Sequence, residues 1–446
     1  MSGSRTLPVM VLALVLCACG GDRERPDPGA LDLVGTGAPA AGSTTAAARI
    51  DAAALHERAF VVDLIQDLVF RKARDGWTLT TPEAHVNIDK LLRGGVDLVF
   101  SAIAPEPGRP AADSLDEQLA AAETLVSETG GRAVMVSGLE QARAERAAGR
   151  IPIMVLLEGA DGLADRLDRL HEYARRGLKI IGLTGPRGGP FGDSASAQID
   201  PGGLTEAGAA LVAACRDQGL VVDLTHASPA LFWDVLAGQG SLVAVSHAAC
   251  RALREHPRNL SDLQILALAR TGGVMGLVFN HELITPGTEG ATIADLVAHV
   301  ERVRALHALD ALAVGSDFGG IRPPAGLPDV ASLPAFTRAL LNAGLSASEV
   351  EGVLGGNALR LIDAVERRQE PSAVSGQVPD RPIYVDCDFY VGEISGVPAA
   401  ACDHDLLGDG PRLPPATRIR LRVREMQRTP ERIEVFGEPG TPWQVE

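Results

Sequence analysis

Eight short apolar runs recur between Arg58 and Arg367, and each is followed by a turn and a helical stretch. Runs that are apolar at nearly every position are typical of parallel strands covered on both faces. The stretches between them, such as Gly203–Gln218, carry Leu, Val and Ala at the three- and four-residue spacing of helices. Eight units in about 310 residues predict a (β/α)8 barrel of the TIM type, with an open sheet as the alternative. The predicted strands are Phe60–Leu64, Val96–Ala102, Ile151–Leu157, Lys179–Thr184, Leu220–Leu224, Leu242–Ser246, Gly273–Phe279 and Leu312–Ser316.

The composition allows a large buried core and excludes one class of partner. Of the 446 residues, 46% are hydrophobic, so the chain is not disordered throughout. Lysine and arginine number 41 against 57 acidic residues, which gives a formal charge of −16. So negative a protein, with only 4% aromatic residues, is a poor partner for nucleic acid.

The first residues have the pattern of an export signal. An apolar run from Leu7 to Leu16 follows Arg5 and has the length of a signal-peptide core. It ends in Leu-Cys-Ala-Cys at Cys19, which resembles the bacterial lipoprotein signal. The resemblance implies cleavage before Cys19, acylation of its thiol and a lipid-anchored protein of the cell envelope. The alternative is an ordinary secretory signal.

Composition also divides the chain into segments. Gly, Pro, Ala, Ser and Thr dominate after the signal, as in a flexible tether. After Arg367 the helical patterns stop, and a Pro/Ser/Gly-bearing linker leads to strand-like pieces without a clear helix. We therefore predict a signal peptide at 1–18, a tether at 19–50, the barrel at 51–368, a linker at 369–381 and a small β-rich extension at 382–446.

The cysteines outside the signal do not form a zinc-finger pattern, because no CxxC pair is present. In an oxidising compartment Cys387 and Cys402 could pair. Cys215 and Cys250 are interpreted as small buried hydrophobic residues.

Ionisable residues stand directly after five of the eight predicted strands. In a parallel barrel these strand ends share one rim, where the chemistry of such folds is found. Taken alone, each of these residues has a structural interpretation, since a lone Asp is often a helix N-cap. Together, two imidazoles and several carboxylates are a ligand set suited to Zn²⁺ or a similar divalent ion. The five residues are Asp67, Glu158, His226, His247 and Asp317.

Six short motifs between about Phe60 and Ile362 resemble those of the membrane (renal) dipeptidases, zinc peptidases with an amidohydrolase-like barrel. They occur in the order in which that family has them. They are Leu157-Glu158-Gly159, Asp223-Leu224-Thr225-His226, Ser246-His247-Ala248, His256-Pro257-Arg258-Asn259, Gly315-Ser316-Asp317-Phe318 and Gly355-Gly356-Asn357.

The resemblance implies a role for each matching residue. Glu158 matches the carboxylate that bridges two zinc ions, and His226 and His247 match the ligands of the second zinc. Arg258 matches the arginine that holds the substrate carboxylate, a task that suits the fork of a guanidinium. Asp317 matches the carboxylate near the scissile peptide and the substrate amine, where it assists proton transfer.

Three positions depart from the family pattern. The first metal site of the family uses a His-x-Asp pair, and here Ile65 stands before Asp67 in place of the histidine. Gly185 replaces the histidine that steadies the oxyanion, and Gly319 replaces a second aspartate. The remaining ligands are those of a mononuclear catalytic zinc site, which Asp67 could complete or supplement with a weakly held second ion. His281 and Arg187 are conceivable substitutes for the missing imidazole and oxyanion donor.

The sequence therefore predicts an exported, lipid-anchored metallo-dipeptidase that uses one zinc ion, with two possible, to activate water against a dipeptide. The ligands are Glu158, His226 and His247, with Asp67 as a further candidate, and Asp317 and Arg258 act on the substrate. Two alternatives remain open. One is a non-catalytic barrel that binds a ligand, and the other is a mononuclear amidohydrolase that acts on a different amide.

Overall fold

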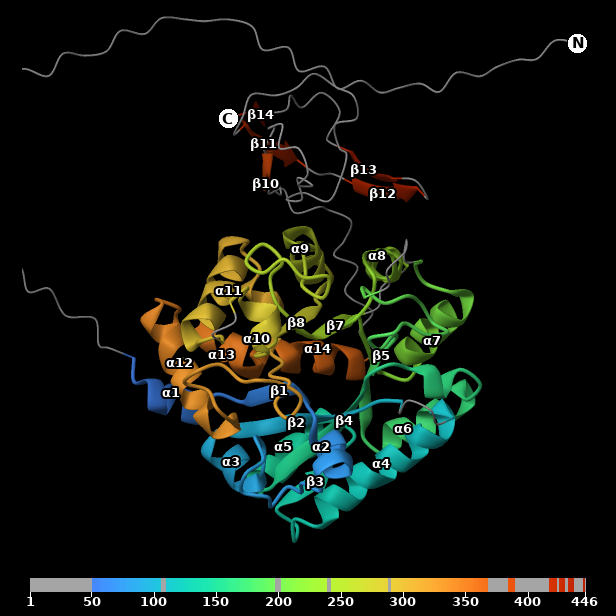
Figure 1. Cartoon of the computed structure of the whole chain (residues 1–446), viewed down its shortest axis with the longest axis vertical. Coiled ribbons are helices and arrows are strands. Elements are labelled where there is room, and N and C mark those ends of the chain that lie inside the picture. The colour runs from blue at the N-terminus through green and yellow to red at the C-terminus, as the bar shows by residue number, and fades with distance from the viewer. Residues whose placement is uncertain are drawn as a thin grey trace, which may run out of the picture. The chain divides into compact units, whose positions relative to one another are not determined.

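The computed structural model describes residues 50–105, 110–196, 202–238, 242–287 and 290–367, together with five strands nearer the C-terminus (Figure 1). The chain divides into two compact units, Arg49–Ser375 and a second unit formed by Met1–Ala48 with Gly376–Glu446. The two units are described separately below.

Eight parallel strands of the first unit close into a barrel. Each pairs with its neighbours around the ring, and pairing of β2 with β4 and of β1 with β9 completes the closure. The predicted (β/α)8 barrel is thereby confirmed. The strands of the ring are β1 (Val61–Gln66), β2 (Val96–Ile103), β4 (Ile151–Leu157), β5 (Leu178–Gly182), β6 (Val221–Asp223), β7 (Val243–Ala248), β8 (Val274–Leu277) and β9 (Leu312–Val314).

One further strand, β3 (Ala133–Met135), was not predicted. It lies beside the first residues of β4, with Ala133 opposite Ile151 and Met135 opposite Ile153. Three residues give too short an apolar run to signal a strand, and this one depends on pairing with β4.

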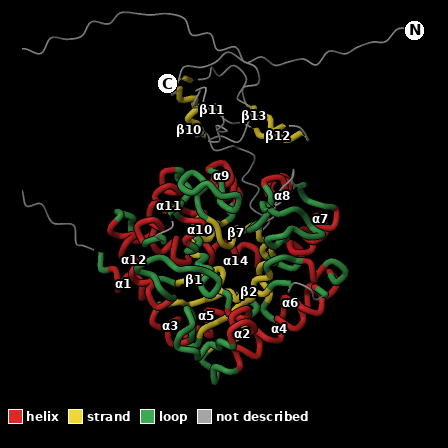
Figure 2. The backbone as a smooth tube through the Cα atoms, in the orientation of Figure 1, coloured by secondary structure: helices red, strands yellow, loops and turns green. Residues whose placement is uncertain are grey.

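Helices surround the strands, as Figure 2 shows. Several begin at a side chain that caps the first turn, for example Ser261 with Gln264 in α9 and Thr292 with Asp295 in α11, which form capping boxes. The helices are α1 (Ala52–Arg58), α2 (Leu68–Asp75), α3 (Ile88–Arg93), α4 (Ala111–Ser127), α5 (Leu139–Ala147), α6 (Leu170–Arg175), α7 (Glu206–Asp217), α8 (Pro229–Ala237), α9 (Asp262–Thr271), α10 (His281–Ile284), α11 (Ile293–Ala305), α12 (Leu333–Asn342), α13 (Ala347–Glu351) and α14 (Asn357–Glu366).

The core consists of two apolar clusters, one inside the barrel and one between barrel and helices. In β4 the odd-numbered residues from Ile151 to Leu157 belong to the outer cluster, whereas Met154 and Leu156 belong to the inner one. This two-residue period places the next even-numbered residue, Glu158, on the inner side. Ala358 and Ile362 of α14 also join the inner cluster, so this helix covers an apolar end of the barrel.

The second unit contains a β-rich segment, as predicted. β10 (Tyr384–Phe389), β11 (Thr417–Arg422) and β14 (Gln444–Val445) form an antiparallel sheet, and β12 (Glu425–Thr429) pairs with β13 (Arg432–Phe436). The predicted Cys387–Cys402 pair and the lipidation at Cys19 lie outside the residues whose side chains are described.

Cys215 and Cys250 are buried free thiols, as expected from the sequence, and burial raises the pKa of each to about 12. Among the helices of the described residues, none has both the length and the apolar character needed to span a bilayer.

Candidate active site

Three of the predicted ligands meet at the carboxyl ends of the strands. Glu158 directly follows β4, and its backbone N–H donates to the Ile103 carbonyl at 2.7 Å, which ties it to the end of β2. His226 follows β6 by three residues, and His247 is the last residue but one of β7. Strand ends far apart in the sequence are thus brought together by closure of the barrel.

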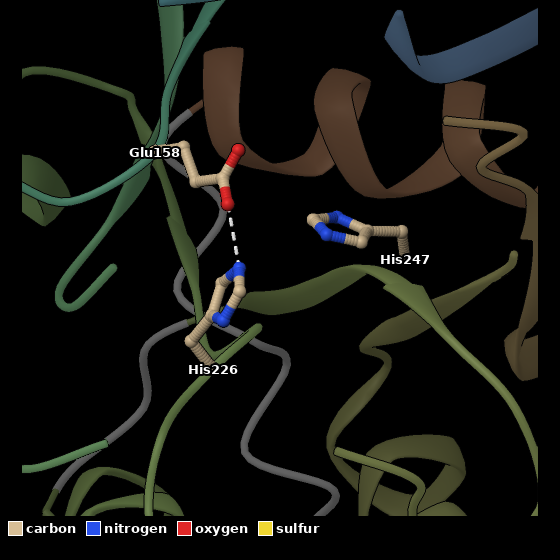
Figure 3. A group of neighbouring side chains, drawn as sticks. All are labelled: Glu158, His226 and His247. Atoms are coloured by element: carbon tan, nitrogen blue, oxygen red, sulfur yellow. Dashed lines mark hydrogen bonds and ion pairs between the residues drawn. The ribbon is translucent and has the colours of Figure 1, made fainter. Parts of the chain in front are cut away.

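The three side chains point toward one another (Figure 3). Glu158 Oε1 lies 2.5 Å from His226 Nε2, and the imidazoles of His226 and His247 stand edge to face with centroids 5.5 Å apart. One ligand atom from each residue falls within 4.8 Å of the other two. A carboxylate and two imidazoles at this separation suit a divalent metal ion such as zinc.

The electrostatics favour the protonation states that a metal requires. Burial raises the pKa of Glu158, but its hydrogen bond to His226 and the nearby imidazoles and Arg258 lower it more, to about 2. Burial, and next the charge of Arg258, lowers the pKa of both His226 and His247. At neutral pH the carboxyl is therefore ionised and the imidazoles are neutral, which are the forms that bind metal.

Arg258 lies against the same ligands. Its Nη1 group is 2.8 Å from His226 Nδ1 and 3.0 Å from Nε2, and its Nη2 donates to the His247 carbonyl at 3.2 Å. Its Nε is buried and has no hydrogen-bond partner among the described residues. Asn259 anchors the loop by donating to the carbonyls of Arg254 and Leu283. Arg258 is thus a fixed cation with a spare hydrogen-bond donor beside the candidate ligands. We name the group of Glu158, His226, His247 and Arg258 the imidazole half.

Asp67 and Asp317 form a second group, which we name the carboxylate half. The Asp67 N–H donates to the Phe318 carbonyl at 2.9 Å, and the Asp317 N–H donates to the Ile65 carbonyl at 3.1 Å. Both carboxylates border Gly320, because a Cβ built there would contact Asp67 Oδ2 and would lie 3.4 Å from Asp317 Oδ1. Burial, together with the charges of Asp67 and Glu158, raises the pKa of Asp317 well above its ordinary value. Asp317 is therefore suited to holding a proton.

The structure also places the positions that depart from the family pattern. Ile65 is fully buried and belongs to the inner apolar cluster. Gly185 lies beside the end of β4, where a Cβ would come 3.7 Å from the Glu158 carbonyl. His281 begins α10, and Arg187 is exposed. Among the described residues, the group that could hold a metal contains none of these four, nor Asp67.

Two residues without a predicted role are Asp63 and Asp223. Both are fully buried carboxyls within apolar strands. The sequence does show a charged residue within each of these apolar strands. That pattern signals a hydrogen-bonded carboxylate, because burying a charge is costly unless it is hydrogen-bonded.

Comparisons with known proteins show what this chain is similar to. The model of the family Membrane dipeptidase (Peptidase family M19) matches residues 49–376. The dipeptidase verJ of Clonostachys rogersoniana is 30% identical over 298 residues, which cover 64% of this chain and 76% of that protein. The dipeptidase aclJ of Aspergillus oryzae is 32% identical over 222 residues, which cover 49% and 52%.

Two solved structures are similar over the barrel. The structure of the dipeptidase AC, a metallo peptidase of family M19, has a TM-score of 0.63 and 25% identity, and the match covers 68% of this chain and 98% of that one. A metallo peptidase from Rhodobacter sphaeroides, liganded with a phosphinate mimic of the dipeptide L-Ala-D-Ala, has a TM-score of 0.63 and 24% identity, with 68% and 99% covered. At 24% identity, the similarity to the Rhodobacter sphaeroides structure shows a shared fold alone.

Proposed function

This chain belongs to the membrane dipeptidase family of metallopeptidases, and we propose that it cleaves dipeptides at a single-zinc site formed by Glu158, His226 and His247. The observation that carries the proposal is the convergence of these three ligand atoms within 4.8 Å. The ligands come from three strand ends, and their pKa shifts keep them in metal-binding form.

The donor set fits zinc, since two imidazoles and one carboxylate are the protein ligands of many catalytic zinc sites. Bound there, the ion would lower the pKa of a coordinated water toward neutrality and so supply a hydroxide nucleophile. The remaining steps depend on side chains of this chain.

Arg258 is proposed to hold the C-terminal carboxylate of the dipeptide. Its guanidinium lies beside His226 and His247, and its Nε–H is buried and lacks a partner among the described residues. A guanidinium binds a carboxylate through two parallel hydrogen bonds, which fixes the orientation of the substrate as well as its position. This contact would place the scissile bond next to the imidazole half.

Asp317 is proposed to move the proton. Hydrolysis takes a proton from the attacking water and delivers one to the leaving nitrogen as the C–N bond breaks. The pKa of Asp317 is raised by burial and by the nearby carboxylates. A carboxyl with a raised pKa can take up the first proton and release it to the amine in the second step.

The proposal predicts a strong preference for a free carboxylate. Each dipeptide in a small panel is compared with its C-terminal amide, for wild type and for Arg258→Ala. We expect wild type to hydrolyse the free acid about 100-fold more efficiently in kcat/KM, and Arg258→Ala to lose this preference. Chelation should abolish turnover and added zinc should restore it. Equal cleavage of acid and amide by wild type would overturn the role of Arg258, and turnover that survives chelation would overturn the metal site.

We further propose that the protein is exported and attached to a membrane through acylated Cys19. The support is the sequence Leu16-Cys17-Ala18-Cys19 after an apolar run. Incorporation of a labelled fatty acid into wild type, and its loss in Cys19→Ala, would test this anchor. Label that persists in the variant would contradict it.

A further inference from the structure

Two buried aspartates make matching sets of hydrogen bonds, one at each half of the site. Asp63 lies in β1 and Asp223 is the last residue of β6, and neither takes part in the proposed chemistry. Their exposed fractions are 0% and 1%. Because a buried carboxylate is costly unless its oxygens accept hydrogen bonds, the donors around each show what it holds in place.

Asp223 binds the residues that precede both imidazoles. Its Oδ1 accepts from the Thr225 N–H at 2.9 Å, the Thr225 hydroxyl at 2.7 Å and the Ser246 N–H at 2.9 Å, and its Oδ2 accepts from the Ser246 hydroxyl at 2.6 Å. Thr225 directly precedes His226, and Ser246 directly precedes His247. In addition, the Ser246 hydroxyl lies 3.0 Å from His247 Nδ1. One carboxylate therefore fixes the backbone at both ligands.

Asp63 repeats this arrangement at the carboxylate half. Its Oδ1 accepts from the Ser316 N–H at 2.8 Å and from the Ile65 N–H at 3.5 Å. Its Oδ2 accepts from the Gln66 amide at 2.7 Å and from the Ser316 hydroxyl. Gln66 directly precedes Asp67, and Ser316 directly precedes Asp317.

Backbone strain marks the same positions. In the described part of the chain, three residues other than glycine have a positive φ, namely His226 at 69°, Asp317 at 63° and His307 at 55°. The first two directly follow Thr225 and Ser316, which the aspartates bind. A strained residue of this kind persists only where its surroundings determine its conformation.

We propose that Asp223 and Asp63 are positioning residues, and that each holds one half of the site. Asp223 presents the two imidazoles to the metal, and Asp63 presents the two carboxylates to the substrate. The inference rests on the proposed function, because it needs a metal at the imidazole half. It also implies that the carboxylate half is still held in a defined geometry although Ile65 has taken the place of a ligand.

The test is a crossed comparison of Asp223→Asn and Asp63→Asn in the full chain, with zinc affinity measured by calorimetry and kcat and KM measured on a dipeptide. Asp223→Asn should weaken zinc binding by about 10- to 100-fold, which is the usual cost of losing a group that orients a metal ligand. Asp63→Asn should leave zinc affinity within about threefold, but should lower kcat about 10-fold or more with little change in KM.

Ser246→Ala and Ser316→Ala form a milder matched pair, since each removes one hydroxyl from one aspartate. They should reproduce the crossed pattern more weakly, and they provide the test if either Asn variant fails to fold. Ser246→Thr keeps a hydroxyl and should therefore retain the zinc affinity that Ser246→Ala loses. A wild-type protein that binds no zinc would overturn the proposed function and this inference with it. A zinc-binding wild type whose two variants lose zinc affinity equally, or not at all, would overturn this inference alone.

Discussion

The imidazole half and the carboxylate half of the barrel mouth differ in what their strand ends have kept. The imidazole half brings three candidate metal ligands together, with ligand atoms of Glu158, His226 and His247 within 4.8 Å. The carboxylate half keeps Asp67 and Asp317, but Ile65 stands where the resemblance places a histidine. Both halves nevertheless rest on a buried aspartate with matching hydrogen bonds.

The carboxylate half keeps an ordered backbone around Ile65, the position where the resemblance places a metal ligand. Ile65 joins the apolar cluster inside the barrel, where an aliphatic side chain needs no hydrogen bond. Its backbone still donates to Asp63 and accepts from Asp317, so the conformation of the strand end does not depend on the missing imidazole. The proposed division of roles, with the carboxylate half acting on the substrate and the imidazole half holding the metal, is compatible with this geometry.

The largest effect is expected from His226→Ala. The substitution removes one of three ligands and leaves Glu158 without its hydrogen bond. Zinc should no longer bind stoichiometrically, and kcat/KM should fall by about 1000-fold or more. His171→Ala is the matched control, because His171 is exposed on α6 and contacts Gln218, and it should keep its zinc. Full zinc content in purified His226→Ala would refute the ligand assignment.

The pH dependence of stability tests the charge state of the imidazole half. The folded-state pKa of Glu158 is about 2, below its ordinary value of 4.5. The ionised carboxylate therefore stabilises the metal-free fold fully above about pH 4.5, and this contribution is lost as the pH falls toward 2. Over that window the unfolding free energy of wild type should fall by up to about 3 kcal/mol more than that of Glu158→Gln. Urea unfolding of chelator-treated protein measures this, and parallel pH profiles for the two proteins would contradict it.

Ile65→His tests whether the carboxylate half can regain a metal. The new imidazole would lie in the strand end beside Asp67, and we expect the zinc content to rise from about one to about two ions per chain. Burying a polar ring in the apolar cluster should cost about 1–3 kcal/mol of stability in the metal-free protein. Ile65→Gln serves as control, because it adds polarity without an imidazole and should bind no second ion. A single zinc in Ile65→His would show that the carboxylate half lacks the geometry for a metal.

The sequence predicts the barrel because its strands and helices follow local patterns, and it singles out the candidate ligands because each of them follows a predicted strand. Apolar runs mark the strands, whereas the two-residue alternation that places Glu158 on the inner side is visible only in the structure, because Ile151–Leu157 contains no polar residue. The hydrogen bonds of Asp63 were not predictable in this way, because Ser316 lies 253 residues further along the chain and meets it only through closure of the barrel. The contact between Arg258 and His226 depends on the path of a loop, for which the sequence has no periodic signal.

The most direct test of the single-zinc account is metal content per chain, measured by mass spectrometry on the same full-length sample used for dipeptide turnover. The account predicts about one zinc per chain together with hydrolysis of free dipeptides. Two zinc ions per chain would contradict the single-metal site. A protein without zinc and without turnover would contradict the proposed catalysis itself.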